Sequence, residues 1–435
     1  MKRILLTLTI LLPLAATAQR QMTLGDCIAH AVAHNVDVKK QDVVRRGQEL
    51  NLHTARHSRL PQLSASGSQS FDFGRSLSSA NTYVSRNTQS TAFSLSANLP
   101  LITGGRLPNQ LAQARLDLAA ATADLESLRD NLGIQVAQAY MEALYQKAML
   151  RVAAEQVELS RSQLARVEAF FKNDKASGAE VAEARSRVAS DELSRVQADN
   201  SFRLALLALS QLIELPSPDS LDISEPDGLL PARIEGSPDA IYAAAVATRP
   251  DVHADSLRIE SAERGVRVAR AAYWPTLSLG AGIGTSYYRT NGLDNSAFGR
   301  QMRDNFSKTV GLSLSIPIFN RFATRNAVRQ AELDVENRRW QLDATRKALY
   351  KEIQQAWYNA VAAQAQWASS NVAVEEARTA FELMQKKYET GKANATEYDE
   401  SRTKRLRAEY DRLAARYQYM FRMKILDFYR GVPLA

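Results

Sequence analysis

Two pairs of glutamates have the residue types and the spacing that suit cation binding. The stretches Ser-Gly-Ala-Glu and Asn-Ala-Thr-Glu each open a helical pattern, and a second glutamate follows one turn later on the same helix face. Ser or Asn with Glu three residues on is the capping-box pattern, which alone explains the first glutamate of each pair. The second glutamates lie beyond the boxes, so capping does not explain them. They are therefore the better candidates for carboxylates that attract cations. The pairs are Glu180 with Glu183 and Glu397 with Glu400.

Two pairs of histidines could bind a metal ion from one helix face. His30 with His34, and His53 with His57, are spaced four residues apart. No acidic residue completes a His-Glu-x-x-His pattern, and the chain has no nucleophile elbow, P-loop or glycine-rich dinucleotide fingerprint. We therefore expect solvated histidines and no catalytic, cofactor or metal site.

The first eighteen residues have the pattern of a signal peptide. Lys2 and Arg3 precede an apolar run over 4–14, and small residues at 16–18 suit a signal peptidase. The 435-residue chain has a net charge of +8, and removal of this segment leaves +6. Export and this mild, evenly spread charge argue against a nucleic-acid partner. The single cysteine, Cys27, excludes an internal disulfide, and we expect a buried apolar side chain there rather than a reactive thiol.

The chain contains the same unit twice. At an offset of 214 residues "AVAHNVDV" (31–38) aligns with "AVATRPDV" (245–252), and beyond the first strand pattern the offset becomes 217. A repeat of this kind indicates that one structural unit occurs twice in the fold. We predict a first structural repeat over 19–214, a Pro/Ser/Asp-rich connector over 215–238 and a second repeat over 239–435.

Each repeat contains two segments that alternate between apolar and polar residues, as strands do. Their polar partners are mostly Ser and Gly, which is typical of a wall with lipid on one side and water on the other. Four strands cannot close a membrane barrel, so several chains must contribute. The predicted strands cover about 62–73, 91–99, 276–288 and 307–316.

Apolar residues recur every seven positions in long segments that follow the strands. This spacing indicates coiled-coil packing. One segment, 104–172, would form a helix roughly 100 Å long. The predicted helices are 104–172 and 178–213 in the first repeat, and 319–389 and 395–429 in the second.

These features together resemble the TolC family of outer-membrane efflux proteins over nearly the whole mature chain. The resemblance is carried by "TLGDCIAHAVAHNVDV" (23–38), "LPLITGGR" (99–106), "IPIFNR" (316–321) and "YETGKANATEYDE" (388–400). It implies an α+β membrane protein, a homotrimer whose four strands per chain form one twelve-stranded barrel continued by an α-helical barrel. The helix–strand junctions would then fall at four prolines, which are Pro61, Pro100, Pro275 and Pro317.

The resemblance also implies a function. The protein would be a passive export duct in the outer membrane, in contact with its lipid and extending into the periplasm, joined through a periplasmic adaptor (membrane fusion protein) to an inner-membrane pump. The family places acidic residues at the positions of Glu397 and Glu400, where they line a periplasmic gate. The helix-hairpin tips would contact the adaptor through Asp174, Ala176, Ser177, Gly178, Gly391, Ala393 and Asn394.

Two positions depart from the family pattern. The mature start has no cysteine, so we expect no lipid anchor there, and Asp174 stands where the family usually has a glycine. The two tips therefore need not bind the adaptor equally. The alternatives are a structural or adhesive periplasmic coiled coil and an enzyme tethered to the envelope. Drug efflux, metal-ion efflux and type I secretion of polypeptides remain open as cargo routes.

Overall fold

The computed structural model describes residues 20–77, 81–85, 87–218, 221–225 and 234–434; the expected signal peptide over 1–18 lies outside them. The chain forms two compact units. The sheet unit comprises Val43–Asp124 and Asp251–Ala344. The hairpin unit comprises the described residues of 20–42, 125–250 and 345–434.

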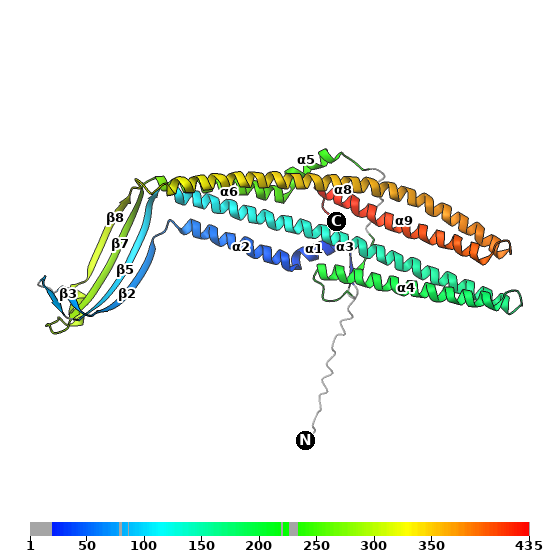
Figure 1. Cartoon of the computed structure of the whole chain (residues 1–435), viewed down its shortest axis with the longest axis horizontal. Coiled ribbons are helices and arrows are strands. Elements are labelled where there is room, and N and C mark those ends of the chain that lie inside the picture. The colour runs from blue at the N-terminus through cyan, green and yellow to red at the C-terminus, as the bar shows by residue number, and fades with distance from the viewer. Residues whose placement is uncertain (1–19, 78–80, 86, 219–220, 226–233, 435) are drawn as a thin grey trace, which may run out of the picture. The chain divides into compact units, whose positions relative to one another are not determined.

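The sheet unit contains a four-stranded antiparallel sheet in the order β2-β5-β7-β8 (Figure 1). The strands are β2 (Gln62–Asp72), β5 (Thr88–Thr103), β7 (Thr276–Thr290) and β8 (Ser307–Ser315). Within the described residues, β2 and β8 each pair on one side only. The connections carry a small hairpin of β3 (Arg75–Leu77) and β4 (Tyr83–Ser85), and a short helix α7 (Phe298–Asp304).

The two faces of this sheet differ in chemistry. On one face the hydroxyls of β2 and β5 form a ladder, with Ser64 and Ser96 2.8 Å apart and Ser66 and Ser94 2.7 Å apart. The opposite face is apolar and exposed to solvent in the single chain, and Val310 on β8 is 79% exposed. A water-soluble sheet would cover such a face. The exposed apolar residues are Leu63, Phe93, Leu95, Ile283, Val310, Leu312 and Leu314.

The helices of the sheet unit pack beside one another through a small apolar cluster and ion pairs. These helices are α6 (Pro250–Arg270), part of α2 (Val36–His57) and the first parts of α3 (Arg106–Phe171) and α8 (Ala323–Glu389). The Arg258 guanidinium bonds Asp124 at 2.5 Å, and the Ser261 hydroxyl bonds Asp117 at the same distance. Ala262, Val266, Val328 and Val335 form the cluster.

The hairpin unit contains two helical hairpins. The remainder of α3 pairs with α4 (Gly178–Leu212), and the remainder of α8 pairs with α9 (Ala395–Tyr429) (Figure 1). Two short helices, α1 (Leu24–His34) and α5 (Pro238–Thr248), complete the unit. Its core gathers large side chains that are almost fully buried, among them Tyr140, Leu144, Leu209 and Ile213.

The predicted connector contains a strand that the sequence pattern did not indicate. In it, β6 (Leu221–Ile223) pairs in parallel with β1 (Arg20–Met22). The Tyr140 hydroxyl donates to the Ser224 carbonyl at 2.6 Å and lies 3.0 Å from the Met22 carbonyl. One buried tyrosine therefore holds this two-stranded sheet against α3.

Cys27 is buried in α1. Burial, and then the charge of Asp26, raise the pKa of its thiol to about 12. At neutral pH the thiol is therefore protonated, and the side chain behaves as a small apolar group.

Eight of the residues with positive φ angles form four pairs 217 residues apart. Gly104 and Gly105 (φ 60° and 84°) correspond to Arg321 and Phe322 (φ 57° and 62°), each pair at a strand-to-helix turn. Asp174 and Gly391 (φ 57° and 71°) occupy the hairpin tips, and Glu214 and Gly431 (φ 59° and 86°) follow the last helices. The same backbone turn is thus made with glycine in one half and with a larger residue in the other.

Three of the four prolines lie where an element changes. Pro61 follows α2, Pro275 precedes β7, and Pro317 follows β8. Pro100 was expected at a junction, and this prediction is wrong: Pro100 lies inside β5, three residues before the strand ends. The pairing of β5 with β7 shifts between Pro100 and Ile102, and such a bulge accommodates a residue that lacks an N–H.

The helix bounds differ from the sequence prediction by a few residues, with α3 starting at Arg106 rather than 104 and α8 at Ala323 rather than 319. Strand β5 is longer than predicted at both ends. None of the described helices has the length and apolarity needed to cross a membrane.

The turn at Gly104 gives a test of this packing. A Cβ at Gly104 would lie 2.6 Å from the Ala271 carbonyl oxygen and 2.7 Å from Trp274 Cβ, whereas a Cβ at Gly105 would meet only Asn109 at 3.6 Å. Both substitutions to alanine strain a positive φ, at about 1–2 kcal/mol. We expect Gly104→Ala to destabilise the protein by about 1–3 kcal/mol more than Gly105→Ala, because it also overpacks the junction. Thermal unfolding of the two variants measures the difference, and equal melting temperatures would contradict the packing at Gly104.

Candidate functional site

The two hairpin tips turn in the same way. After α3, the Lys175 N–H bonds the Phe170 carbonyl at 2.9 Å, and the Asp174 N–H bonds that of Phe171 at 3.1 Å. After α8, the Lys392 N–H bonds the Lys387 carbonyl at 2.8 Å, and the Gly391 N–H bonds that of Tyr388 at 3.0 Å. Both are Schellman motifs. Asp174 therefore makes, in a left-handed conformation, the turn that Gly391 makes at the other tip.

A capping box begins each returning helix. The Ser177 N–H bonds Glu180 Oε2 at 2.6 Å, and the Glu180 N–H bonds Ser177 Oγ at 3.2 Å. The Asn394 N–H bonds Glu397 Oε2 at 3.0 Å, and the Glu397 N–H bonds Asn394 Oδ1 at 2.9 Å. Glu180 and Glu397 therefore serve as caps, whatever else they do.

The second glutamates differ from each other. Glu183 is exposed and lines a pocket between the hairpins, together with Glu180. Glu400 is also exposed and does not line this pocket. The structure of the single chain thus brings Glu180 and Glu183 together with residues of the second hairpin, but does not bring Glu397 and Glu400 to them.

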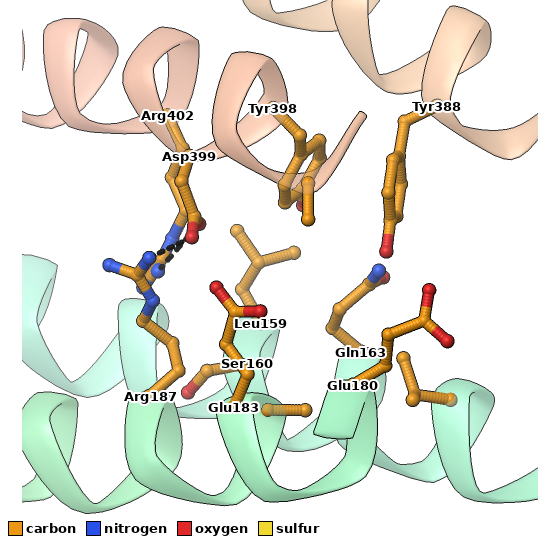
Figure 2. A pocket seen from close by; sticks show the side chains of 13 residues that line it. Leu159, Ser160, Gln163, Glu180, Glu183, Arg187, Tyr388, Tyr398, Asp399 and Arg402 are labelled. Carbon is orange, nitrogen blue, oxygen red and sulfur yellow. Dashed lines mark hydrogen bonds and ion pairs between the residues drawn. The ribbon is translucent and has the colours of Figure 1, made fainter. Parts of the chain in front are cut away.

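This pocket lies between α3 and α4 on one side and the second hairpin on the other (Figure 2). It encloses about 60 Å³, which is too small for a drug-sized molecule. Tyr388 and Tyr398 stack across its second-hairpin side, with ring centroids 4.9 Å apart. Burial raises the pKa of Tyr388, and the negative charges of Glu180, Glu183 and Asp399 raise it further. The pocket is a closely packed contact between the hairpins and not a binding cavity.

A network of arginines and aspartates joins α4 to α9 beside the pocket. Arg187 and Asp191 on α4 form ion pairs with Asp399 and Arg402 on α9, respectively (Figure 2 shows the Arg187–Asp399 side). Arg402 Nη1 also lies 3.9 Å from Asp399. Arg402 is only 4% exposed, so its charge depends on these carboxylates.

Further contacts join α3 of the first hairpin to both helices of the second. Arg166 Nη1 on α3 lies 2.8 Å from Glu389 on α8. Arg405 stands over the Phe381 ring at 4.6 Å and donates to Gln156 of α3 at 3.3 Å. Near the tips, polar and ionic contacts therefore add to the apolar core that the two hairpins share.

The sequence prediction missed the arginine–aspartate network. The sequence pattern that could have indicated this network is a complementary order of charges. Helix α4 has Arg and then Asp one turn later, whereas α9 has Asp and then Arg one turn later. Parallel helices with these orders can form two ion pairs at once. The sequence alone does not show that α4 and α9 are neighbours.

The histidine pairs occupy different settings. His30 Nδ1 lies 2.8 Å from the Ile213 carbonyl, and His34 Nδ1 lies 2.9 Å from the His30 carbonyl. His30 is therefore partly buried in a structural contact and not simply solvated. The His53 and His57 rings are 6.3 Å apart. Nowhere in the part of the chain that the structure describes do three His, Cys, Asp or Glu side chains form a group that could hold a metal ion.

The tip residues predicted to contact an adaptor lie around the two turns. Asp174, Ser177, Gly178, Gly391 and Asn394 are exposed, whereas Ala176 and Ala393 are half-buried. None of these side chains lines the pocket between the hairpins.

Comparison with known proteins finds a match to one protein family. The family model described as "Outer membrane efflux protein" matches the chain twice, over residues 27–213 and 241–426. The chain is 28% identical over 309 residues to the pyoverdine export outer membrane protein OpmQ of Pseudomonas putida, a match that covers 69% of this chain and 62% of OpmQ. It is 30% identical over 310 residues to the protein CyaE of Bordetella pertussis, covering 71% of this chain and 62% of CyaE. The matches thus span less than two thirds of these relatives.

Solved structures give the same fold. The outer membrane protein VceC of Vibrio cholerae superposes with a TM-score of 0.77 at 20% identity, over 95% of this chain and 97% of VceC. The structure of CusC superposes with a TM-score of 0.75 at 20% identity, over 94% of this chain and 92% of that one. At these identities the likeness concerns the fold alone.

The arginine–aspartate network predicts how the tips respond to mutation. Arg402→Met leaves the carboxylate of Asp191 without its ion-pair partner, and breaking a buried pair of this kind costs about 3–5 kcal/mol. We expect faster amide hydrogen exchange in the first turns of α4 and α9, with no change in the core around Tyr140. Arg407→Met, at an exposed position of the same helix, is the matched control. Unchanged exchange at the tips in Arg402→Met would show that the network does not hold the hairpins together.

Proposed function

The chain belongs to the outer membrane efflux protein family, and we propose on this premise that three copies form a passive export duct across the outer membrane and periplasm. The observation that carries the proposal is the sheet. One face is apolar and exposed, the other is lined with hydroxyls and glycines, and both edge strands lack a partner on one side within the described residues. These properties suit a wall between lipid and water that is closed by further copies.

A water-filled lumen favours three copies over two. Two copies would give eight strands, and an eight-stranded barrel is just filled by its own side chains. Three copies would give twelve strands and leave room for water inside. The hydroxyl ladder of Ser64, Ser66, Ser94 and Ser96 would then line a polar lumen, which binds cargo weakly.

We propose that the chain is an internal duplication with repeats over 19–214 and 239–435. Two observations support this: the family model matches twice, and positive φ angles recur 217 residues apart. Each repeat would contribute one helical hairpin to the periplasmic part of the duct. Anchorage in the membrane would come from the strands and not from a lipid, since the single cysteine, Cys27, is buried.

The duct would act with two partners, a periplasmic adaptor and an inner-membrane pump that supplies the energy. We assign no catalytic role to the chain. OpmQ is named for pyoverdine export and CusC for cation efflux, so relatives serve different cargoes. Tripartite efflux and type I secretion both remain within the proposal.

We propose that the four glutamates form a periplasmic gate. In three copies they would place up to twelve carboxylates around one narrow passage. The ion pairs of Arg187 with Asp399 and of Arg402 with Asp191 would keep the hairpins together in the closed state. Opening would exchange these contacts for water or for an adaptor.

Conductance tests the duct itself. Purified protein added to a planar bilayer should give stepwise increases in current, because a closed twelve-stranded barrel has a water-filled lumen. A periplasmic coiled coil or a tethered enzyme would give none. Soluble release from cells, with no detergent-stable oligomer and no conductance, would contradict the duct.

Charge selectivity tests the gate. We expect Glu397→Gln with Glu400→Gln to lower the ratio of cation to anion permeability by about twofold or more and to weaken block by divalent cations, because carboxylate rings attract cations. Glu376→Gln with Glu382→Gln changes the net charge equally at exposed positions of α8 and is the control. If Glu397→Gln with Glu400→Gln keeps the wild-type selectivity and the wild-type block by divalent cations, these glutamates do not form a gate.

A bulky residue tests docking at the tip. Ala393 is half-buried and has no positive φ, so Ala393→Phe adds bulk without straining the turn. We expect it to abolish export from cells while the trimer stays intact. Gly391→Ala strains the turn (φ 71°) without bulk, and a Cβ there meets nothing within 4 Å, so it controls for the turn alone. Full export by Ala393→Phe would count against docking there.

A further inference from the structure

Strand β7 extends past its neighbour β8 at the end of the sheet away from the helices. The last pair joins Gly284 to Ser307, so residues 285–290 have no strand on that side. In the described chain this edge is filled by the segment that follows, which contains α7. Open backbone groups of this kind need a substitute partner.

Three amide side chains supply that substitute. Asn305 donates to the Ser286 carbonyl at 2.6 Å. Gln301 accepts from the Tyr288 N–H and donates to the Tyr288 carbonyl, both at 3.0 Å. Asn295 accepts from the Thr290 N–H at 2.8 Å and donates to the Thr290 carbonyl at 2.9 Å. Alternate residues of β7 are thus paired by side chains, and α7 is fixed to the sheet.

The fixed helix has a defined orientation. Phe298 packs edge-to-face on Tyr287 at 5.0 Å, and the Thr285 hydroxyl donates to the Met302 carbonyl at 2.5 Å. Residues 298, 301 and 302 therefore face β7. At 100° per residue, Arg300 and Arg303 lie on the opposite side of the helix, and both are exposed.

Two further cations lie on the apolar face, Lys308 at the start of β8 and Arg289 near the end of β7. Lys308 pairs with Ile283, which belongs to the apolar face, and its Nζ stands 5.7 Å from the centre of the exposed Phe306 ring. Arg289 lies on that face too, because every second residue of β7 points the same way and Arg289 follows Thr285 and Tyr287 in that series. Within the described residues none of Arg289, Arg300, Arg303 and Lys308 forms an ion pair. The exposed acid Asp304 on α7 partly offsets this charge.

We propose that this end of the sheet binds the phosphate-bearing headgroups of membrane lipids. The surface would consist of Arg289, Arg300, Arg303 and Lys308. The register places Lys308 and Arg289 about 20 Å apart along β7, so these two would contact separate headgroups. The apolar face beside the four cations suits acyl chains, and the guanidinium groups suit phosphate oxygens. Gln301 is a positioning residue that holds the two arginines of α7 in place. The inference rests on the proposed function, because it requires the sheet to lie in a lipid bilayer.

The test is lipid binding to the purified protein in detergent, measured by native mass spectrometry. Phosphatidylglycerol is the probe, because it carries a phosphate without a balancing positive charge, and phosphatidylcholine is its zwitterionic counterpart. We expect preferential retention of phosphatidylglycerol by the wild type and an affinity lower by about tenfold in Arg300→Gln with Arg303→Gln. Gln301→Leu should lower it too, because it releases α7 from β7.

Two controls separate the possible outcomes. Arg346→Gln with Lys351→Gln removes the same charge from exposed positions of α8 and should leave binding unchanged. Equal losses in both double variants, or no preference for phosphatidylglycerol, would overturn the site. Displacement of the lipid by an equal concentration of inorganic phosphate would also overturn the lipid site, because it would show that the cations bind phosphate itself and not a lipid. Since this test needs no conductance, a duct that conducts but shows no lipid preference would disprove the lipid site alone.

Discussion

The two unpaired edges of the four-stranded sheet are the constraint on which the rest of the structure depends. Strands β2 and β8 each have one neighbour among the described residues, and their apolar face is exposed. In lipid, every open N–H and C=O costs several kcal/mol, so the edges must meet. The four strands of a single chain are too few to close into a barrel. The proposed association of several copies would close these edges, and the alternation of Ser and Gly with apolar residues would give the closed barrel a polar lumen.

The two helical hairpins end in the same way at their tips. Both tips use the same Schellman turn and the same capping box, although one turns at Asp174 and the other at Gly391. Apolar packing holds the core around Tyr140, whereas the contacts between α4 and α9 are ion pairs. Water can replace ion pairs at a lower cost than it can solvate a large apolar core. In the proposed opening, the contacts near the tips would therefore exchange with water while the core around Tyr140 stays packed.

Much of this architecture could be predicted from sequence, and the exceptions have physical reasons. A period of two indicates strands because successive side chains point to opposite faces of a sheet, and a period of seven indicates long helices because it marks a packed seam. Pro100 suggested a strand end, but a bulge accommodates it within β5. The helix α7 was missed because the amides of Asn295, Gln301 and Asn305 pair with β7 without any periodic signal. The capping boxes were readable locally, whereas the pairing of Arg402 with Asp191 depends on which helices become neighbours.

The most direct test of the central claim is a cross-link between the two edge strands. One cysteine is placed on β2 and one on β8 in a Cys27→Ala background, and oxidised protein is analysed on non-reducing gels. The positions, all on the polar face, are Ser64, Ser66 and Ser68 on β2 with Thr309, Gly311 and Ser313 on β8. Closure by three copies predicts that at least one pairing gives covalent trimers and no larger species. Dimers only, or a ladder that continues beyond three chains, would contradict a closed barrel of three copies.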